Sequence, residues 1–115
     1  MLRKIALGFM LFALAIIGGP AFAESVPTLH EVYQATQAGR LDEAQSMMNK
    51  VLQEHPNSAK AHYVEAEILV KKGMLGKAET ELNNAERLEP GLPFAKPQAV
   101  QELKNRIAAA HSVGQ

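Results

Sequence analysis

Residues 39–56 read GRLDEAQSMMNKVLQEHP, and residues 73–90 read GMLGKAETELNNAERLEP. When the two stretches are aligned at an offset of 34 residues, five positions are identical: Gly39 and Gly73, Leu41 and Leu75, Ala44 and Ala78, Asn49 and Asn83, and Pro56 and Pro90. Self-similarity at a fixed period of this length indicates a repeat architecture, in which each copy is one supersecondary unit. We therefore interpret residues 24–58 and 59–92 as two copies of one unit.

Each copy is predicted to form a helix, a tight turn and a second helix. In the second copy, apolar residues at three- and four-residue spacings predict helices over 59–72 and 77–89. Ser58 is a suitable N-cap for the first of these helices, and Gly73 suits the position just after its end. In the first copy, Asp42 and Gln45 are predicted to form a capping box. A proline follows the second helix of each copy and ends it.

The pattern Gly39-x-Leu41-x-x-Ala44-x-x-x-Met48-x-x-Val51-x-x-x-x-Pro56, with its second copy, resembles the tetratricopeptide repeat family. The resemblance implies an all-α fold, an α-solenoid of two helix-turn-helix repeats. It also implies that Ala44 and Ala78 lie where paired helices cross. The first copy departs from the family pattern at Val32, which is bulkier than usual. Both copies depart from it at Glu31 and Glu65, where the family normally has Leu.

Residues 93–115 are predicted to close the stack as a proline-rich loop and a capping helix. A repeat buries its apolar face only against a neighbour, so the terminal unit is specialised. Pro97 suits the first position of a helix, which is expected to reach about His111. The apolar side of this helix is predicted to comprise Val100, Leu103, Ile107 and Ala108. Phe94 is expected to anchor the loop on the second repeat.

Residues 1–23 have the composition of a secretory signal peptide. Arg3 and Lys4 precede thirteen residues without a polar side chain, 5–17, and Ala21-Phe22-Ala23 offers small residues for cleavage after Ala23. The alternative is an uncleaved membrane anchor, for which the apolar run is short. The expected location is the periplasm of a Gram-negative bacterium or the space outside the cell. Any membrane contact is expected only through this segment, if it is retained.

The remaining chain argues against several classes of function. Residues 24–115 carry 10 basic and 12 acidic side chains without a basic block, so nucleic acid is not an expected partner. The chain has no Cys, which excludes thiolate chemistry and disulfides. Its four His show no metal-ligand spacing, and no phosphate loop or nucleophile motif is present. We expect no cofactor, no metal and no catalysis; a small hydrolase built on the His and Glu residues is the enzyme alternative.

Glu31 and Glu65 occupy the same position in the two copies. If adjacent first helices pack together, the two carboxylates could come close enough to raise one pKa. The alternative is that both are exposed, or that Lys60, Lys71 or a His pairs with them.

The family resemblance also implies a binding surface. In that family the first helix of each repeat lines the concave face and receives a peptide or a partner's helix. The matching partner-binding candidates here, together with Val26, are Leu29, Tyr33, Gln37, Lys60, Tyr63, Glu67, Val70 and Lys71. Both tyrosines of the chain fall among them, either as binding residues or as covers of the helix packing seam. The expected function is an exported interaction module or scaffold in the cell envelope for a protein or peptide partner. The alternative is a structural homodimer with no other ligand.

Overall fold

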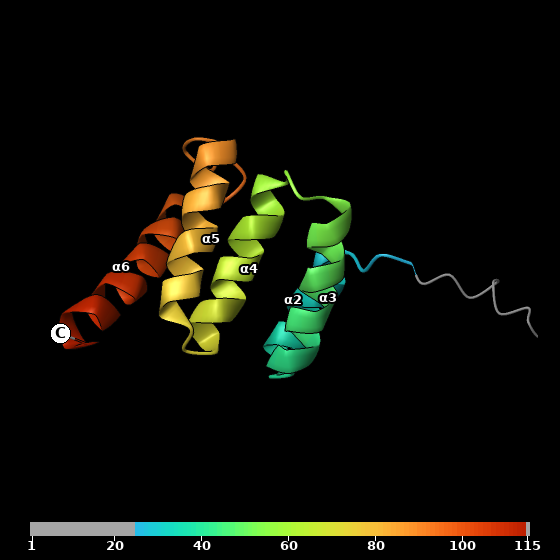
Figure 1. Cartoon of the computed structure of the whole chain (residues 1–115), viewed down its shortest axis with the longest axis horizontal. Helices are drawn as coiled ribbons and strands as arrows, with labels where there is room; N and C mark the ends of the chain where they lie inside the picture. Colours follow the sequence, from blue (N-terminus) through green and yellow to red (C-terminus); the bar gives the residue numbers. More distant parts are fainter. Residues whose placement is uncertain (1–24, 115) are drawn as a thin grey trace, which may run out of the picture.

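The computed structural model describes residues 25–114 as an all-α solenoid (Figure 1). Its helices are α2 (Leu29–Gln37), α3 (Leu41–Glu54), α4 (Ala59–Lys71), α5 (Leu75–Leu88) and α6 (Pro97–Gly114). Neighbouring helices pack in chain order, and α4 additionally contacts α2 and α6. We call α2 and α3 the first repeat and α4 and α5 the second. The predicted signal peptide lies outside the described residues.

The ends of the helices follow from local sequence. Thr28 caps α2 through a reciprocal capping box with Glu31, and the Ser58 hydroxyl accepts from the Ala61 N–H at the start of α4. The predicted N-cap at Ser58 is therefore confirmed. Gly39 and Gly73 follow the first helix of each repeat with φ of 83° and 79°. Because side chains disfavour this left-handed region, glycine at these two turns lets each hairpin close tightly.

The predicted capping box of Asp42 and Gln45 is wrong. The turn at Gly39 brings the chain into helix earlier than expected, so α3 begins at Leu41 with Arg40 as its N-cap residue. Asp42 therefore lies within the first turn, where a carboxylate interacts favourably with the helix dipole. The second repeat behaves alike, since α5 begins at Leu75, two residues before the expected start.

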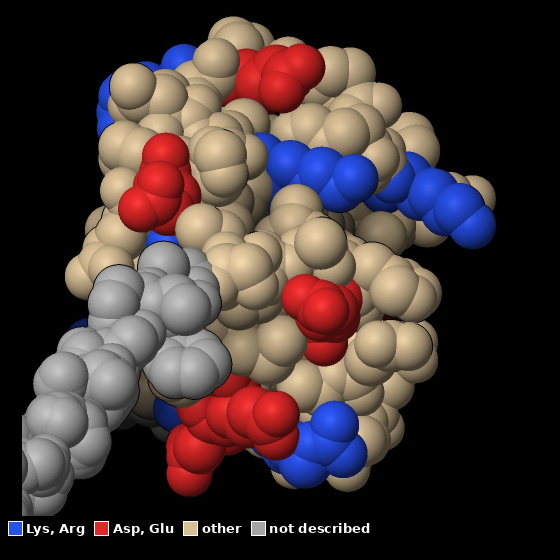
Figure 2. Space-filling view, turned by 90° about the vertical axis from the view of Figure 1, so that its right-hand side faces the viewer, with Lys and Arg blue, Asp and Glu red and all other residues tan. Residues whose placement is uncertain are grey.

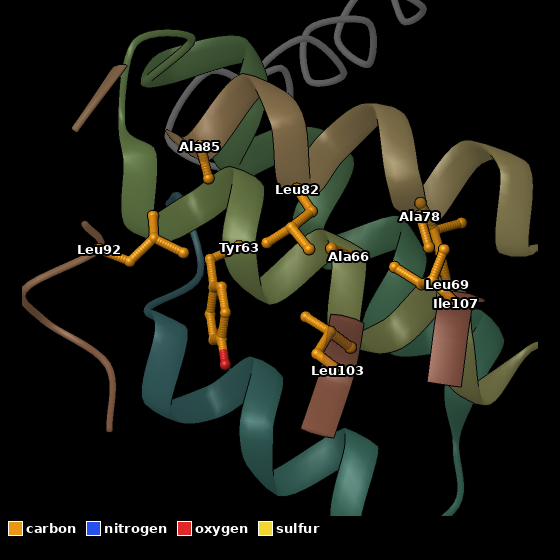
Figure 3. Packing of buried hydrophobic residues seen from close by; sticks show 9 residues of the cluster. All are labelled: Tyr63, Ala66, Leu69, Ala78, Leu82, Ala85, Leu92, Leu103 and Ile107. Carbon is orange, nitrogen blue, oxygen red and sulfur yellow. The ribbon is translucent and has the colours of Figure 1, made fainter. Parts of the chain in front are cut away.

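Helix α4 contributes buried residues to two apolar clusters. Its residues Ala61, Val64 and Ile68 join the first cluster, completed by Val32, Ala35, Ala44, Met48 and Val51 from α2 and α3. Its residues Tyr63, Ala66 and Leu69 join the second cluster, shown in Figure 3, with Ala78, Leu82, Ala85, Leu92, Leu103 and Ile107. One helix with two apolar sides therefore joins the repeats into a single stack.

Small residues lie at the predicted helix crossings. Ala44 in α3 and Ala78 in α5 are both 0% exposed, which confirms their expected position between packed helices. Met48 and Leu82, one turn further along the same helices, fill the space beside them and are also buried. A larger side chain at either alanine would force the helices apart, because protein interiors have no spare volume.

The loop after α5 fastens α6 against the second repeat. Leu92 is buried and takes a left-handed φ of 46° after Gly91, which turns the chain back toward α4. The ring of Phe94 packs edge-on against Tyr63, with centroids 5.7 Å apart, which confirms it as the anchor of the loop. Helix α6 begins at Pro97 as predicted and buries Leu103 and Ile107.

Two expectations for α6 are wrong. The helix continues past His111 to Gly114, since no helix-breaking residue intervenes. Ala108 is exposed, because it lies about 100° around the helix from Ile107 and so leaves the buried stripe. None of the helices within residues 25–114 combines the length and the hydropathy that a membrane span requires.

Candidate functional site

The face formed by α2, α4 and α6 contains two grooves that meet on α4. The α2–α4 groove has a volume of about 220 Å³ and is lined by Tyr33, Thr36, Gln37, Val64, Glu67, Ile68 and Lys71. Val64 and Ile68, each 1% exposed, form its apolar floor. The α4–α6 groove has a volume of about 130 Å³ and is lined by Glu67, Lys71, Ala99, Glu102, Leu103 and Arg106. Glu67 and Lys71 line both grooves, so the two form one continuous surface across α4.

Tyr33 and Glu67 link the two repeats at this surface. The Tyr33 hydroxyl donates a hydrogen bond of 2.9 Å to Glu67 Oε1, and the two residues are 34 positions apart. Equivalent positions on adjacent first helices therefore lie within side-chain reach of each other. The bond fixes the carboxylate between the grooves, so that its orientation is set before any partner binds.

The electrostatics of this pair follow from partial burial. Burial raises the pKa of Glu67, while the Tyr33 hydrogen bond and the charge of Lys71 oppose that rise. Burial, together with the negative charge of Glu67, raises the pKa of Tyr33 far above its usual value. The hydroxyl therefore stays protonated and remains a donor to the carboxylate at physiological pH. This surface thus offers a fixed carboxylate and a lysine ammonium above an apolar floor.

The other predicted binding residues lie around these grooves. Leu29 is half-buried against the first cluster, and Val70 is half-buried against the second. Lys60 is exposed near the start of α4, and Val26 is 37% exposed before α2. None of these four lines the two grooves.

Tyr63 differs from the other candidates because it belongs to the core. Its side chain is 4% exposed and packs against Phe94. Figure 3 shows Tyr63 within the second cluster. Burial raises the pKa of its hydroxyl to about 12, and the charge of Glu67 adds to the effect. The hydroxyl is buried without a hydrogen-bond partner among residues 25–114. Tyr63 therefore offers little surface to a partner.

The sequence interpretation missed the contribution of α6. Glu102 and Arg106 lie one turn apart and face the α4–α6 groove together with Glu67 and Lys71. The signal was present in the repeat pattern, because α6 stands where the first helix of a third unit would stand. Because α6 was interpreted only as a cap, its contribution to a binding surface was not predicted.

Glu31 and Glu65 do not form a pair. Glu31 is exposed, and its Oε1 accepts the backbone N–H of Thr28 at 2.9 Å. Glu65 is 7% exposed and accepts a hydrogen bond from the Gln45 amide of α3. The close approach that was considered for the two carboxylates is therefore not observed, and the alternative that both are exposed is wrong, because α3 covers only the second carboxylate.

The described part of the chain contains no group of three His, Asp or Glu side chains that could hold a metal ion. Within that part, the grooves also lack an arrangement of nucleophile, base and orienting acid. The chemistry of this surface is suited to binding. Glu67 can accept a hydrogen bond, Lys71 or Arg106 can bind an acceptor, and the apolar floor can contact an apolar group.

Comparison with known proteins identifies one relationship. Residues 35–107 match the family model described as tetratricopeptide repeat. The match begins near the end of α2 and ends within α6, so it includes all of α3, α4 and α5 and parts of α2 and α6. Searches of curated proteins and of solved structures found no match.

Proposed function

The chain belongs to the tetratricopeptide repeat family, and from that premise we propose that it is an exported module that holds a protein or peptide partner on the face of α2, α4 and α6. Repeats of this family are protein-interaction units without catalytic groups of their own. The observation that supports this face most strongly is the sharing of Glu67 and Lys71 by its two grooves. A partner lying across α4 would meet both charges at once.

The charges of the surface indicate the kind of partner segment that fits. Glu67 and Glu102 alternate with Lys71 and Arg106 around the α4–α6 groove. A segment that carries both a basic and an acidic side chain would satisfy these groups, with an apolar side chain over Val64 and Ile68. Such mixed charges contribute more to specificity and orientation than to total affinity.

A site-specific crosslinking experiment tests this face. A photoreactive residue at Gln37, which is exposed beside the α2–α4 groove, is expected to capture a discrete partner in the envelope. The same probe at Gln53, exposed on α3, is the matched control and should not capture it. Lys71→Glu should lower the yield at Gln37 severalfold. Equal capture from both positions, or capture unchanged by Lys71→Glu, would reject the face.

The proposed export rests on residues 1–23, with their basic start and apolar run. It predicts a mature protein that begins at Glu24. Cell fractionation followed by N-terminal sequencing tests both parts of this statement. An intact Met1 would show that the segment is retained, and a cytoplasmic product would reject export.

A second candidate function is self-association through the end of the first repeat. Figure 2 looks onto this end, where acidic and basic side chains are scattered among uncharged ones. A groove of about 320 Å³ there is lined by Ser25, Pro27, Glu31, Gln34, Ala35, Arg40, Glu43 and Met47. Sedimentation velocity over a range of micromolar concentrations decides: a strict monomer rejects the homodimer.

A further inference from the structure

A third groove, separate from the proposed partner face, lies between α3, α4 and α5. These three helices stand side by side in Figure 1. The α3–α5 groove has a volume of about 540 Å³, which is within the usual range for small-molecule sites. It is lined by Gln45, Asn49, Glu65, Leu69, Lys72, Met74, Lys77, Thr80 and Glu81. It shares no residue with the grooves of the α2, α4 and α6 face.

Two buried oxygens at this groove have no donor. Glu65 is 7% exposed, and its Oε1 has no hydrogen-bond partner among residues 25–114; the same holds for Gln45 Oε1. The amide of Gln45 donates to the other carboxylate oxygen, Oε2. An unsatisfied buried acceptor destabilises the protein, so a ligand that supplies donors gains affinity by removing this cost. Two unsatisfied acceptors on side chains that contact each other favour a primary ammonium, which has three N–H donors.

Gln45 is the side chain that controls access to the carboxylate. It is only half-buried and lines the groove, while Glu65 lies beneath it. Rotation of the Gln45 amide would open the Glu65 carboxylate to the groove and turn the Gln45 Oε1 toward the same ligand. An incoming ammonium would then replace one amide donor by a charged donor, which forms the stronger hydrogen bond.

The charges of the groove are separated along the helices. Lys72, the C-cap residue of α4, lies seven positions after Glu65, a rise of roughly 10 Å along the helix. On α5, Lys77 precedes Glu81, so both helices place a lysine toward the turn that joins them and a carboxylate further from it. His62 holds Glu81 through a contact of 2.6 Å. Leu69 lies on α4 between the two charged ends and offers an apolar wall.

The lysines at the other end favour an anionic group on the same ligand. Lys72 pairs with Asp42 at 3.2 Å, but the Asp42 side chain is 97% exposed, so this pair is weak and easily exchanged. Lys77 is exposed at the groove. A second cation on the ligand would be repelled here, whereas a carboxylate would be attracted.

We propose that the α3–α5 groove binds a small zwitterionic amino acid, with its ammonium group at Glu65 and Gln45 and its carboxylate at Lys72 and Lys77. The separation of the charged ends favours a linear ω-amino acid over an α-amino acid, because only the former can span both ends. The methylene chain would then lie along Leu69.

Titration of the purified protein, followed by amide chemical shifts, tests the proposal with defined probes. Glycine, 4-aminobutyrate and 6-aminohexanoate form a series of increasing length, and hexylamine and hexanoate are the singly charged controls. We expect saturable shifts around Gln45, Glu65 and Lys77, with affinity rising along the series. Removing either charge should weaken binding roughly tenfold, the usual scale of a charge-assisted contact. No saturable shift, or equal binding of hexylamine, would overturn the proposal.

Variants make the assignment specific. Glu65→Gln keeps the shape but removes the charge, and should weaken 6-aminohexanoate binding by about tenfold or more. Glu31→Gln, at the equivalent exposed position of the first repeat, is the control and should leave binding unchanged. Lys77→Gln alters only an exposed side chain and should also weaken binding, which provides an answer even if Glu65→Gln disturbs folding. Unchanged affinity in Lys77→Gln and in a folded Glu65→Gln would reject the site.

Discussion

The two repeats contain the same 34-residue pattern but bury their first helices to different extents. In α2 three of nine residues are buried, whereas in α4 eight of thirteen are. The difference comes from neighbours: within residues 25–114, α4 packs against α2, α3, α5 and α6, while the main contacts of α2 are with α3 and α4. Glu31 and Glu65 show the consequence, because the same residue caps a helix in water in one copy and lies beneath α3 in the other. The position in the repeat therefore sets the direction of a side chain, and the neighbouring helices determine its contacts and its burial.

The largest expected effect on stability comes from removing α6, which covers the apolar side of the second repeat. Truncation after Pro93 deletes Leu103 and Ile107, which are buried in the second cluster, and exposes the apolar side of α4 and α5. Fully burying one such side chain contributes about 1.5–3 kcal/mol, a large part of the stability of a small domain. We expect the truncated protein to lose its cooperative thermal transition, measured by circular dichroism.

A matched truncation after Ala109 keeps both buried residues of α6. We expect it to unfold cooperatively with a midpoint near that of the parent. A sharp transition in the shorter protein as well would show that α6 is not needed to cover the second repeat.

The next largest effect on stability is expected from substitutions at equivalent positions of the two repeats. Tyr63→Ala removes a buried ring and its contact with Phe94, and should lower the free energy of unfolding by about 3 kcal/mol or more. Leu29→Ala, at the equivalent position of the first repeat, removes a half-buried side chain and should cost about 1 kcal/mol. Urea unfolding measures both. Similar losses would mean that the end of the first repeat is covered, as a homodimer requires.

Much of this fold was predictable because the 34-residue self-similarity of the sequence marks where each repeat begins and ends. The glycine turns and the loop anchor Phe94 follow from residue type and spacing. The crossings at Ala44 and Ala78 follow from the resemblance to the tetratricopeptide repeat family. The predicted capping box at Asp42 is wrong, because α3 begins two residues earlier than expected, and that shift depends on how the preceding turn closes.

The candidate site was less predictable, because it depends on packing between helices. Tyr33 and Glu67 were assigned to one face from repeat position, but their hydrogen bond appears only when the repeats stack. Tyr63 was assigned to that face as well, and the depth of its burial depends on Phe94 and α6. Periodicity identifies the side of a helix; it does not reveal how completely a later segment covers it.

The pH dependence of stability tests the covered carboxylate. Burial raises the pKa of Glu65 above 4.5, while the Gln45 hydrogen bond opposes the rise. The folded state therefore retains this proton at a pH where the unfolded state loses it. The associated stability is complete below pH 4.5 and is lost as the pH rises through the folded pKa. The slope is at most about 1.4 kcal/mol per pH unit for one proton.

Two variants should change the pH dependence of stability in opposite directions. Glu65→Gln has no proton to lose, so the free energy of unfolding should vary less with pH above 4.5 than in the parent. Gln45→Ala removes the opposing hydrogen bond, so the loss of stability should extend to higher pH. Urea unfolding at a series of pH values measures both. A profile unchanged in Glu65→Gln would show that this carboxylate does not titrate as its burial requires.

The smallest expected effect compares the two tyrosine hydroxyls. Tyr33→Phe removes the donor to Glu67 and leaves a half-buried carboxylate less satisfied, which should cost about 1 kcal/mol. Tyr63→Phe removes a buried hydroxyl that has no partner among residues 25–114, and should leave stability unchanged or raise it slightly. Thermal unfolding of the two variants under one condition gives the difference. Tyr33→Phe should also weaken the crosslink from Gln37, since Glu67 loses its fixed orientation, whereas Tyr63→Phe should not. If Tyr63→Phe costs as much stability as Tyr33→Phe, its hydroxyl has a partner in solution, and the second repeat is more hydrated beneath α6 than its burial indicates.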